Sequence, residues 1–220
     1  MSLFQKFFRR SGANQDDAGN GGERITRRSN GLAELIKRMS HEGACSVLDL
    51  GPTSPTNITF FTGLQHRTHA EDVLRASRDP QYLVDNSEGH KVIDSDRFLT
   101  DNLNFEAEQF DSVLVWDACD YMDEGLVKPV VQRIHHILKP GGALLAFFHT
   151  KDAGPDAPYF RYHIGAPGTL DLQAIVPSAD AHFRLQRVFN NRHIENLFHD
   201  YGSIKFFLGR DNIREVLVIR

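Results

Sequence analysis

Polar side chains that can exchange protons follow two apolar runs of the sequence. The first run, residues 110–117, ends at Asp117 and is followed by Asp120 and Tyr121. The second run, residues 143–148, is followed by His149. Both runs are typical of buried parallel strands, because β-branched and aromatic residues fill them. Open α/β sheets bind ligands at the carboxyl ends of their strands, so these side chains are candidate catalytic groups. His149 is the best candidate base by its ordinary pKa. The alternative is a strand-end histidine that is only hydrogen-bonded.

A second candidate site is the loop after an earlier apolar run. Residues 47–50 read as a strand that stops at Gly51, and a helix is expected to begin after Ser54. Ser54 suits the N-cap, and Pro55 suits the first helical position, where its missing N–H costs nothing. A strand that feeds a helix through a short loop presents backbone donors and the positive end of a helix dipole. This pattern indicates a loop that binds anionic or polar ligand groups.

Two acidic residues follow this loop at a suggestive spacing. Glu71 and Asp72 lie about 20 residues beyond Gly51, where dinucleotide-binding folds place an acid against ribose hydroxyls. The alternative is an exposed strand end, since acids are common there.

The elements that must position these groups alternate between strands and helices. Apolar residues at helical spacing predict helices over 29–40 and 123–138, before and between the strands. Strands and helices in this order predict a doubly wound, mostly parallel α/β sheet with helices on both faces. Residues 204–208 and 215–219 read as two terminal strands joined as a hairpin at the edge of this sheet.

An inserted β-hairpin is expected after the fifth strand. Alternating apolar and polar residues over 159–176 flank the turn at 165–168. Tyr159, Arg161, Tyr162 and His163 lie in its first half. They could cover the substrate side of the site, and the alternative is that the hairpin extends the core.

Residues 1–28 are expected to be a flexible segment before a single domain at 29–220. Residues 1–10 are basic and apolar at helical spacing, but ten residues form only a marginal helix. Docking on a membrane surface is one interpretation. Fraying is the other.

Composition limits the partners and the compartment. A net charge of −4 gives no drive toward nucleic acid. No apolar run is long enough to span a membrane. Cys45 and Cys119 have no paired spacing, which favours reduced thiols and a cytoplasmic protein. The adjacent His135 and His136 point about 100° apart on a helix and cannot chelate a metal together, so no metal site is expected. The oligomeric state is open.

Three blocks of the sequence carry a resemblance to a known family. They are VLDLG at 47–51, FDSVLVWDACDYM at 110–122 and ILKPGGALLAFF at 137–148, and the ending SIKFFLGRDNIREVLVIR adds to them. With these blocks, residues 29–220 resemble the class I S-adenosylmethionine-dependent methyltransferases of the type 11-like branch. The resemblance implies a Rossmann-like sheet of seven strands with the last strand antiparallel.

The resemblance also implies a cofactor, S-adenosyl-L-methionine, and roles for particular residues. Asp49, Gly51 and Thr53 would line the cofactor loop, Glu71 would bind the ribose, Asp101 would lie on the adenine side, and Trp116 and Asp117 would face cofactor and substrate. Trp116 has a core residue as its alternative. The family has glycine at the positions of Thr53 and Pro55, so the glycine-rich loop is degenerate here.

Two functions follow from these observations. The first is a methyltransferase that acts on a small-molecule acceptor, with Asp117 or His149 as the catalytic base. Such a reaction needs mainly alignment, because the cofactor carries the activated methyl group. The second is a methyltransferase-like binding or scaffold protein that has lost catalysis, which the altered loop favours.

Overall fold

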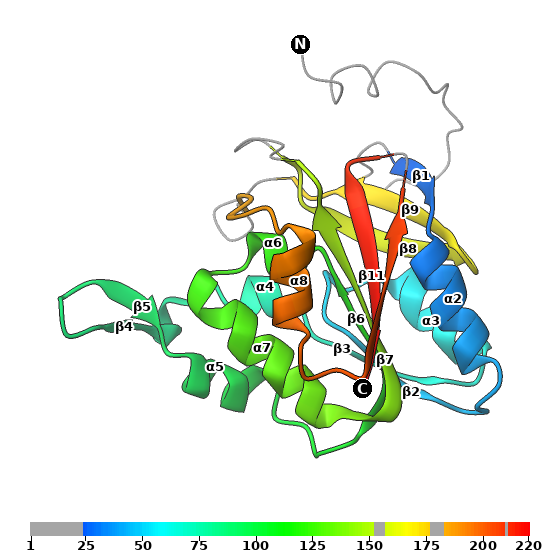
Figure 1. Ribbon diagram of the computed structural model, residues 1–220, viewed down its shortest axis with the longest axis horizontal. Helices are drawn as coiled ribbons and strands as arrows, with labels where there is room; N and C mark the ends of the chain where they lie inside the picture. The colour runs from blue at the N-terminus through cyan, green and yellow to red at the C-terminus, as the bar shows by residue number, and fades with distance from the viewer. Residues whose placement is uncertain (1–23, 152–156, 177–182, 210) are drawn as a thin grey trace, which may run out of the picture.

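A six-stranded sheet forms the centre of the fold (Figure 1). The structure is a computed structural model that describes residues 24–151, 157–176, 183–209 and 211–220. The strands of the central sheet are β2 (Ser46–Asp49), β3 (Arg67–Ala70), β6 (Phe110–Trp116), β7 (Leu138–His149), β10 (Ser203–Leu208) and β11 (Ile213–Ile219).

The order of the strands is β10-β11-β7-β6-β2-β3. The pairs β3 with β2, β2 with β6 and β6 with β7 are parallel, whereas β11 is antiparallel to both of its neighbours. The expectation of a mostly parallel sheet with an antiparallel last strand is therefore confirmed.

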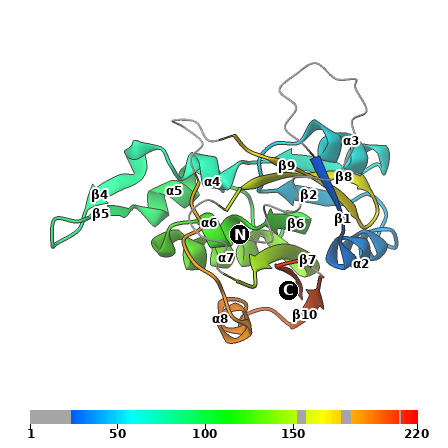
Figure 2. The ribbon, with the colours of Figure 1, turned by 90° about the horizontal axis from the view of Figure 1, so that it is seen from above.

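Helices cover both faces of this sheet, as Figures 1 and 2 show. The helices with their bounds are α2 (Asn30–Met39), α3 (Pro55–Gly63), α4 (Val73–Ala76), α5 (Ser95–Asn102), α6 (Ala118–Tyr121), α7 (Glu124–Ile137) and α8 (Asn191–Leu197). Alternate residues of β6 separate into two cores. Val113 and Val115 pack on the side of α7 and α8, and Leu114 and Trp116 pack on the side of α2 and α3.

Side-chain caps fix where the two helices nearest the candidate loop begin. The Ser29 hydroxyl accepts the N–H of Leu32 at the start of α2, and the Ser54 hydroxyl accepts the N–H of Asn57 at the start of α3. Pro55 occupies the first turn of α3, as expected from its fixed φ.

A second, three-stranded sheet packs beside α3, with the order β1-β9-β8. Its strands are β1 (Arg24–Arg28), β8 (Phe160–Ala166) and β9 (Thr169–Ala174). Strands β8 and β9 pair antiparallel within the residues expected to form the inserted hairpin. Residues 24–28, expected to belong to the flexible segment, instead pair with β9 as an edge strand. The rest of that segment, residues 1–23, lies outside the described residues.

The described central sheet has six strands rather than the expected seven. Between β3 and β6 the chain forms α4, the 3-10 helix η1 (Pro80–Tyr82), a small hairpin of β4 (Leu83–Asp85) and β5 (Lys91–Ile93), and α5. This hairpin projects away from the sheet (Figures 1 and 2). Residues 76–102 are polar and offer no apolar run that could fill a buried strand, so the chain adds no seventh strand there. None of the helices in the described residues is long and apolar enough to cross a membrane.

Candidate functional site

Asp49 lies at the carboxyl end of β2 and is almost completely buried. One carboxylate oxygen accepts Nε1 of Trp116 at 2.6 Å and the N–H of Gly51 at 3.1 Å, and the other accepts Nδ2 of Asn57 at 2.8 Å. Burial raises the pKa of Asp49, and these three donors act against the shift. Asp49 is therefore a buried acceptor that joins the loop, the first turn of α3 and the end of β6.

Trp116 covers the loop at Gly51. A Cβ added to Gly51 would overlap Cδ1 of Trp116 and lie 2.8 Å from its Nε1. Trp116 ends β6 with a φ of 52°, a left-handed conformation that is unusual for a bulky residue, and the register with β7 shifts between Leu114 and Trp116. Its indole stacks on Tyr162 of β8, with centroids 4.9 Å apart and planes 6° apart.

Asn57 and Ser54 attach the second sheet to this loop. Nδ2 of Asn57 donates to the carbonyl of Tyr162 at 3.0 Å, and its Oδ1 accepts the N–H of Ile164 at 2.8 Å. Oγ of Ser54 lies 2.9 Å from Nδ1 of His163. Asn57 was not among the residues expected in the site. The available signal was a polar residue three positions after the cap, among the apolar residues of a short helix.

Asp117 is fully buried at the point where β6 passes into α6. Within the described residues, neither of its carboxylate oxygens has a hydrogen bond of normal length and angle, although the hydroxyl of Tyr162 is near enough to act on its pKa. Burial raises the pKa of Asp117 to about 7, while the charge of His149 and the hydroxyl of Tyr162 act in the opposite direction. A carboxyl group with this pKa can take up or release a proton near neutral pH.

His149 ends β7 and is held by Asp120. One oxygen of Asp120 accepts the main-chain N–H of His149 at 2.6 Å and lies 2.8 Å from its Nδ1. Burial lowers the pKa of His149, but the bond to Asp120 and the charge of Asp117 outweigh it, so the pKa is raised. The structure therefore brings Asp117, Asp120 and His149 together, as the ends of the two strands predict.

Glu71 and Thr53 lie on the outer side of this cluster. Glu71 follows β3, and its N–H donates to the carbonyl of Asp49 at 2.9 Å. Its side chain is partly buried, and burial followed by the charge of Asp72 raises its pKa. Thr53 is exposed and does not fill the loop.

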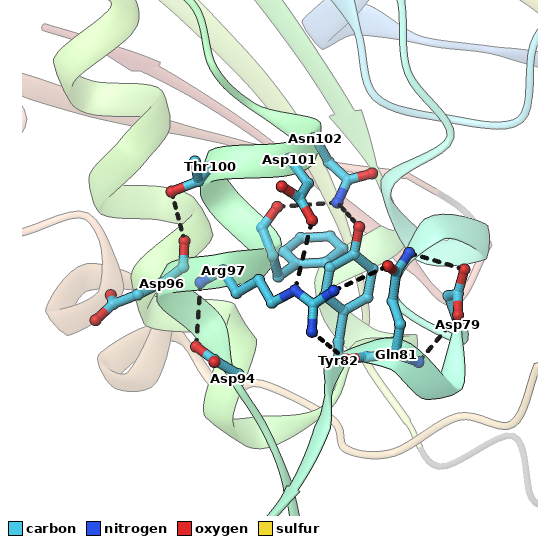
Figure 3. Close-up of polar contacts among 10 residues, drawn as sticks. Asp79, Gln81, Tyr82, Asp94, Asp96, Arg97, Thr100, Asp101 and Asn102 are labelled. Carbon is cyan, nitrogen blue, oxygen red and sulfur yellow. Dashed lines mark hydrogen bonds and ion pairs between the residues drawn. The ribbon is translucent and has the colours of Figure 1, made fainter.

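Asp101 does not join the site. It lies on α5, where its carboxylate is 3.9 Å from Nε of Arg97 and both side chains are largely exposed. Figure 3 shows this pair beside Gln81 and Tyr82 at the base of the β4–β5 hairpin. The structure therefore gives no support to the expected adenine-side role. The segment that carries Asp101 forms α5 and adds no strand to the central sheet, so this role stays a prediction.

No group of three or more His, Cys, Asp or Glu side chains that could hold a metal ion occurs within the part of the chain that the structure describes. Asp120 and His149 are the closest acidic and imidazole pair at the strand ends, and they are already bonded to each other.

The strand order decides the type of fold. Strand β11 lies between β10 and β7 and is antiparallel to β7. From β7 onward, the strands β7, β6, β2 and β3 run parallel to one another. The chain has the class I methyltransferase fold. The loop after β2 lies beside the carboxyl ends of β3 and β6, because both strands pair parallel with β2.

Known proteins are similar to this chain only at low sequence identity. No family model and no curated protein matches the chain. Among solved structures, the chain is 14% identical to the 1,6-didemethyltoxoflavin-N1-methyltransferase of Burkholderia thailandensis with bound 1,6-didemethyltoxoflavin and S-adenosylhomocysteine, over 86% of this chain and 76% of that one, with a TM-score of 0.45. It is 8% identical to a SAM dependent methyltransferase from Archaeoglobus fulgidus, over 86% and 92% of the two chains, with a TM-score of 0.48. These are likenesses of fold, and no activity follows from them.

The residues of the methyltransferase-fold crevice fit a nucleoside cofactor only in part. Asp117 offers a buried carboxylate without a partner among the described residues, and Glu71 lies at the end of β3, where an acid can meet hydroxyl groups. At Gly51, however, the indole of Trp116 occupies the space into which a Cβ would project. The indole therefore covers the main chain at Gly51, and a cofactor would reach this part of the loop only if Trp116 moved.

Proposed function

We propose that this chain is an S-adenosylmethionine-dependent methyltransferase that acts on a small-molecule acceptor, and that the structure describes a closed state. The observation that carries the proposal is Asp117. Its carboxyl group lies at the carboxyl end of β6 and is fully buried, and neither oxygen has a hydrogen bond of normal length and angle among the described residues, with the hydroxyl of Tyr162 as its neighbouring donor. Buried polar groups are normally paired, so a group left unpaired at the ligand-binding edge of an α/β sheet favours a missing ligand.

The side chains at the crevice have distinct roles in this proposal. When bound, the cofactor supplies an activated methyl group. Asp117, with a pKa of about 7, takes the proton that the acceptor loses, and Asp120 orients His149 beside it. Glu71 accepts hydroxyl groups at the end of β3.

Titration calorimetry with S-adenosylhomocysteine tests this function. We expect Glu71→Ala to weaken binding by about tenfold or more, because a lost hydrogen bond to a charged group is worth about 1.5–3 kcal/mol. Asp85→Asn is the matched control, since Asp85 lies on the β4–β5 hairpin and pairs with Lys91. An absence of heat and of thermal stabilisation at millimolar ligand, both in the wild type and in Trp116→Ala, would refute the proposal.

A second function has its own observation. Trp116 covers Gly51, and Thr53 and Pro55 replace the glycines of the family pattern, which favours a binding or scaffold protein without catalysis. The two functions differ in the behaviour of Trp116→Ala. A methyltransferase binds the nucleoside more tightly when the indole is removed, whereas a scaffold protein that has lost the cofactor site binds it neither before nor after.

A further inference from the structure

The side chain of Trp116 packs over the loop after β2. Its Nε1 donates to Asp49 at 2.6 Å, and its ring covers the face of Gly51. Trp116 is only 1% exposed. Its indole occupies a hydrogen-bonding position on Asp49 that a ligand could otherwise take. The loop is closed by a side chain of the same chain.

The second sheet holds this side chain in place. Tyr162 stacks flat on the indole, and Phe147 of β7 meets it edge-on with centroids 5.5 Å apart. Asn57 bonds to Asp49 and to the main chain of β8 at both Tyr162 and Ile164. Movement of β8 away from α3 would therefore remove the stacking partner of Trp116 and two of the bonds of Asn57 together.

The closed arrangement carries two local costs. Trp116 has a φ of 52°, which is unfavourable for a bulky side chain and persists only where the surroundings impose it. The adjacent Asp117 keeps two buried oxygens without partners among the described residues. A core tryptophan selected only for packing needs neither feature. A ligand group that donates a hydrogen bond at this strand end would pair the Asp117 oxygens.

We infer that Trp116 is a gate: its indole closes the nucleoside crevice at Gly51, and the β1-β9-β8 sheet holds the gate shut through Tyr162. This inference rests on the proposed function, because it describes how access to that same crevice is controlled. Ligand binding then selects the open state, and the apparent affinity falls in proportion to the population of that state.

Fluorescence reports the gate directly, because Trp116 is the only tryptophan in the chain. In the wild type we expect emission at short wavelength and protection from acrylamide quenching. Tyr162→Ala should shift the emission to longer wavelength and increase quenching severalfold. Tyr162→Phe is the matched control, since it keeps the stacked ring, and it should leave both measurements unchanged. Protection that persists in a folded Tyr162→Ala variant would overturn the role of the second sheet.

Calorimetry with S-adenosylhomocysteine then tests what the gate controls. For an open population of about 10%, Trp116→Ala should raise the apparent affinity about tenfold. Equal affinity of the wild type and the variant, with Trp116 emission unchanged by ligand, would overturn the gate and leave the proposed function standing. Gate opening in Tyr162→Ala without binding to any variant would instead refute the proposed function. Circular dichroism and thermal melting identify variants that fail to fold, and the wild-type emission titration does not depend on them.

Discussion

Arg27 of β1 and Glu215 of β11, 188 residues apart, form an ion pair of 2.7 Å whose side chains are only 8% and 3% exposed. The other oxygen of Glu215 accepts the hydroxyl of Ser29 at 3.0 Å and the N–H of Gly31 at 2.6 Å. One carboxylate thus ties the second sheet and the start of α2 to the central sheet. Burial raises the pKa of Glu215, and the bonds from Gly31, Arg27 and Ser29 act against the shift.

Loss of this carboxylate should be strongly destabilising. We expect Glu215→Ala to lower the free energy of unfolding by about 3–5 kcal/mol, because it removes the buried partner of the Arg27 guanidinium and leaves only the partly exposed Asp211 at 3.1 Å. Asp85→Ala removes an exposed pair with Lys91 and should cost less than about 1 kcal/mol. Urea denaturation measures both, and a Glu215→Ala value as small as the control would contradict the structural role.

The stability of the protein should fall as the pH rises through the range in which Asp117 ionises. The pKa of Asp117 is raised from 3.8 to about 7 in the folded state, so its contribution is present below about pH 4 and is lost by about pH 7. The difference between these two pKa values corresponds to a loss of at most roughly 4 kcal/mol in the free energy of unfolding. His149, Asp120 and the hydroxyl of Tyr162 are the titratable groups whose interactions with Asp117 also contribute to this pKa.

Asp117→Asn should remove this dependence. Between pH 5 and pH 8 the wild type should lose stability as Asp117 ionises, whereas the variant should not. The buried amide can change the stability of the variant by a constant amount, which does not affect this comparison. The urea midpoints of both proteins at pH 5 and pH 8 measure this difference. Asp96→Asn makes the same chemical change at an exposed position of α5 and is the control. Parallel pH profiles for Asp117→Asn and the wild type would show that Asp117 is already ionised in the folded protein.

Most of the fold could be predicted because local patterns specify it. The apolar runs give β2, β6 and β7, and Ser54 with Pro55 gives the start of α3. The expected seventh strand came from the family resemblance and not from residues 76–102, which have no apolar run. Where the residues and the resemblance disagreed, the residues were the better guide.

The site was less predictable because its contacts are long-range. The bonds from Asn57 and Trp116 to Asp49 join residues 8 and 67 positions apart. The φ of Trp116 follows from the irregular end of β6 and from stacking on Tyr162, which no local pattern encodes. The placement of Asp117 and His149 at neighbouring strand ends could be predicted because strand ends can be read from the sequence, and their catalytic roles stay a prediction.

Gly51 should be required because of Trp116 and not because of its own backbone. Its φ is outside the left-handed region in which only glycine is comfortable, yet an added Cβ meets the indole. We expect Gly51→Ala to cost about 1–3 kcal/mol in the wild type through overpacking, and much less in a Trp116→Ala background.

A double-mutant cycle measured by urea denaturation gives this coupling. Gly63→Ala is the matched control, because nothing lies within 4 Å of its added Cβ near the end of α3. Additive effects of Gly51→Ala and Trp116→Ala would place the indole away from the loop and would remove the structural basis of the gate.

The contact of Ser54 with His163 should make the attachment of the second sheet sensitive to acid. The Ser54 hydroxyl accepts the N–H of Asn57, so its own proton is free to be donated to Nδ1 of His163. Nε2 of His163 then donates to Oε1 of Gln173 at 3.0 Å, which defines a neutral imidazole. Burial is the largest cause that lowers the pKa of His163, and Arg24 and Arg161 add to it, while Gln173 and Asp171 oppose it.

A lowered pKa gives stability that is present above the ordinary pKa of 6.5 and is lost as the pH falls. We expect His163→Gln to lose less stability than the wild type between pH 7 and pH 5, in thermal melts of both proteins. His193→Gln on the exposed face of α8 is the control and should follow the wild type. Because the pKa of His149 is raised, that residue acts in the opposite direction, and the comparison between variants separates the two. If His163→Gln and the wild type lose equal stability, the imidazole is not held neutral by Ser54.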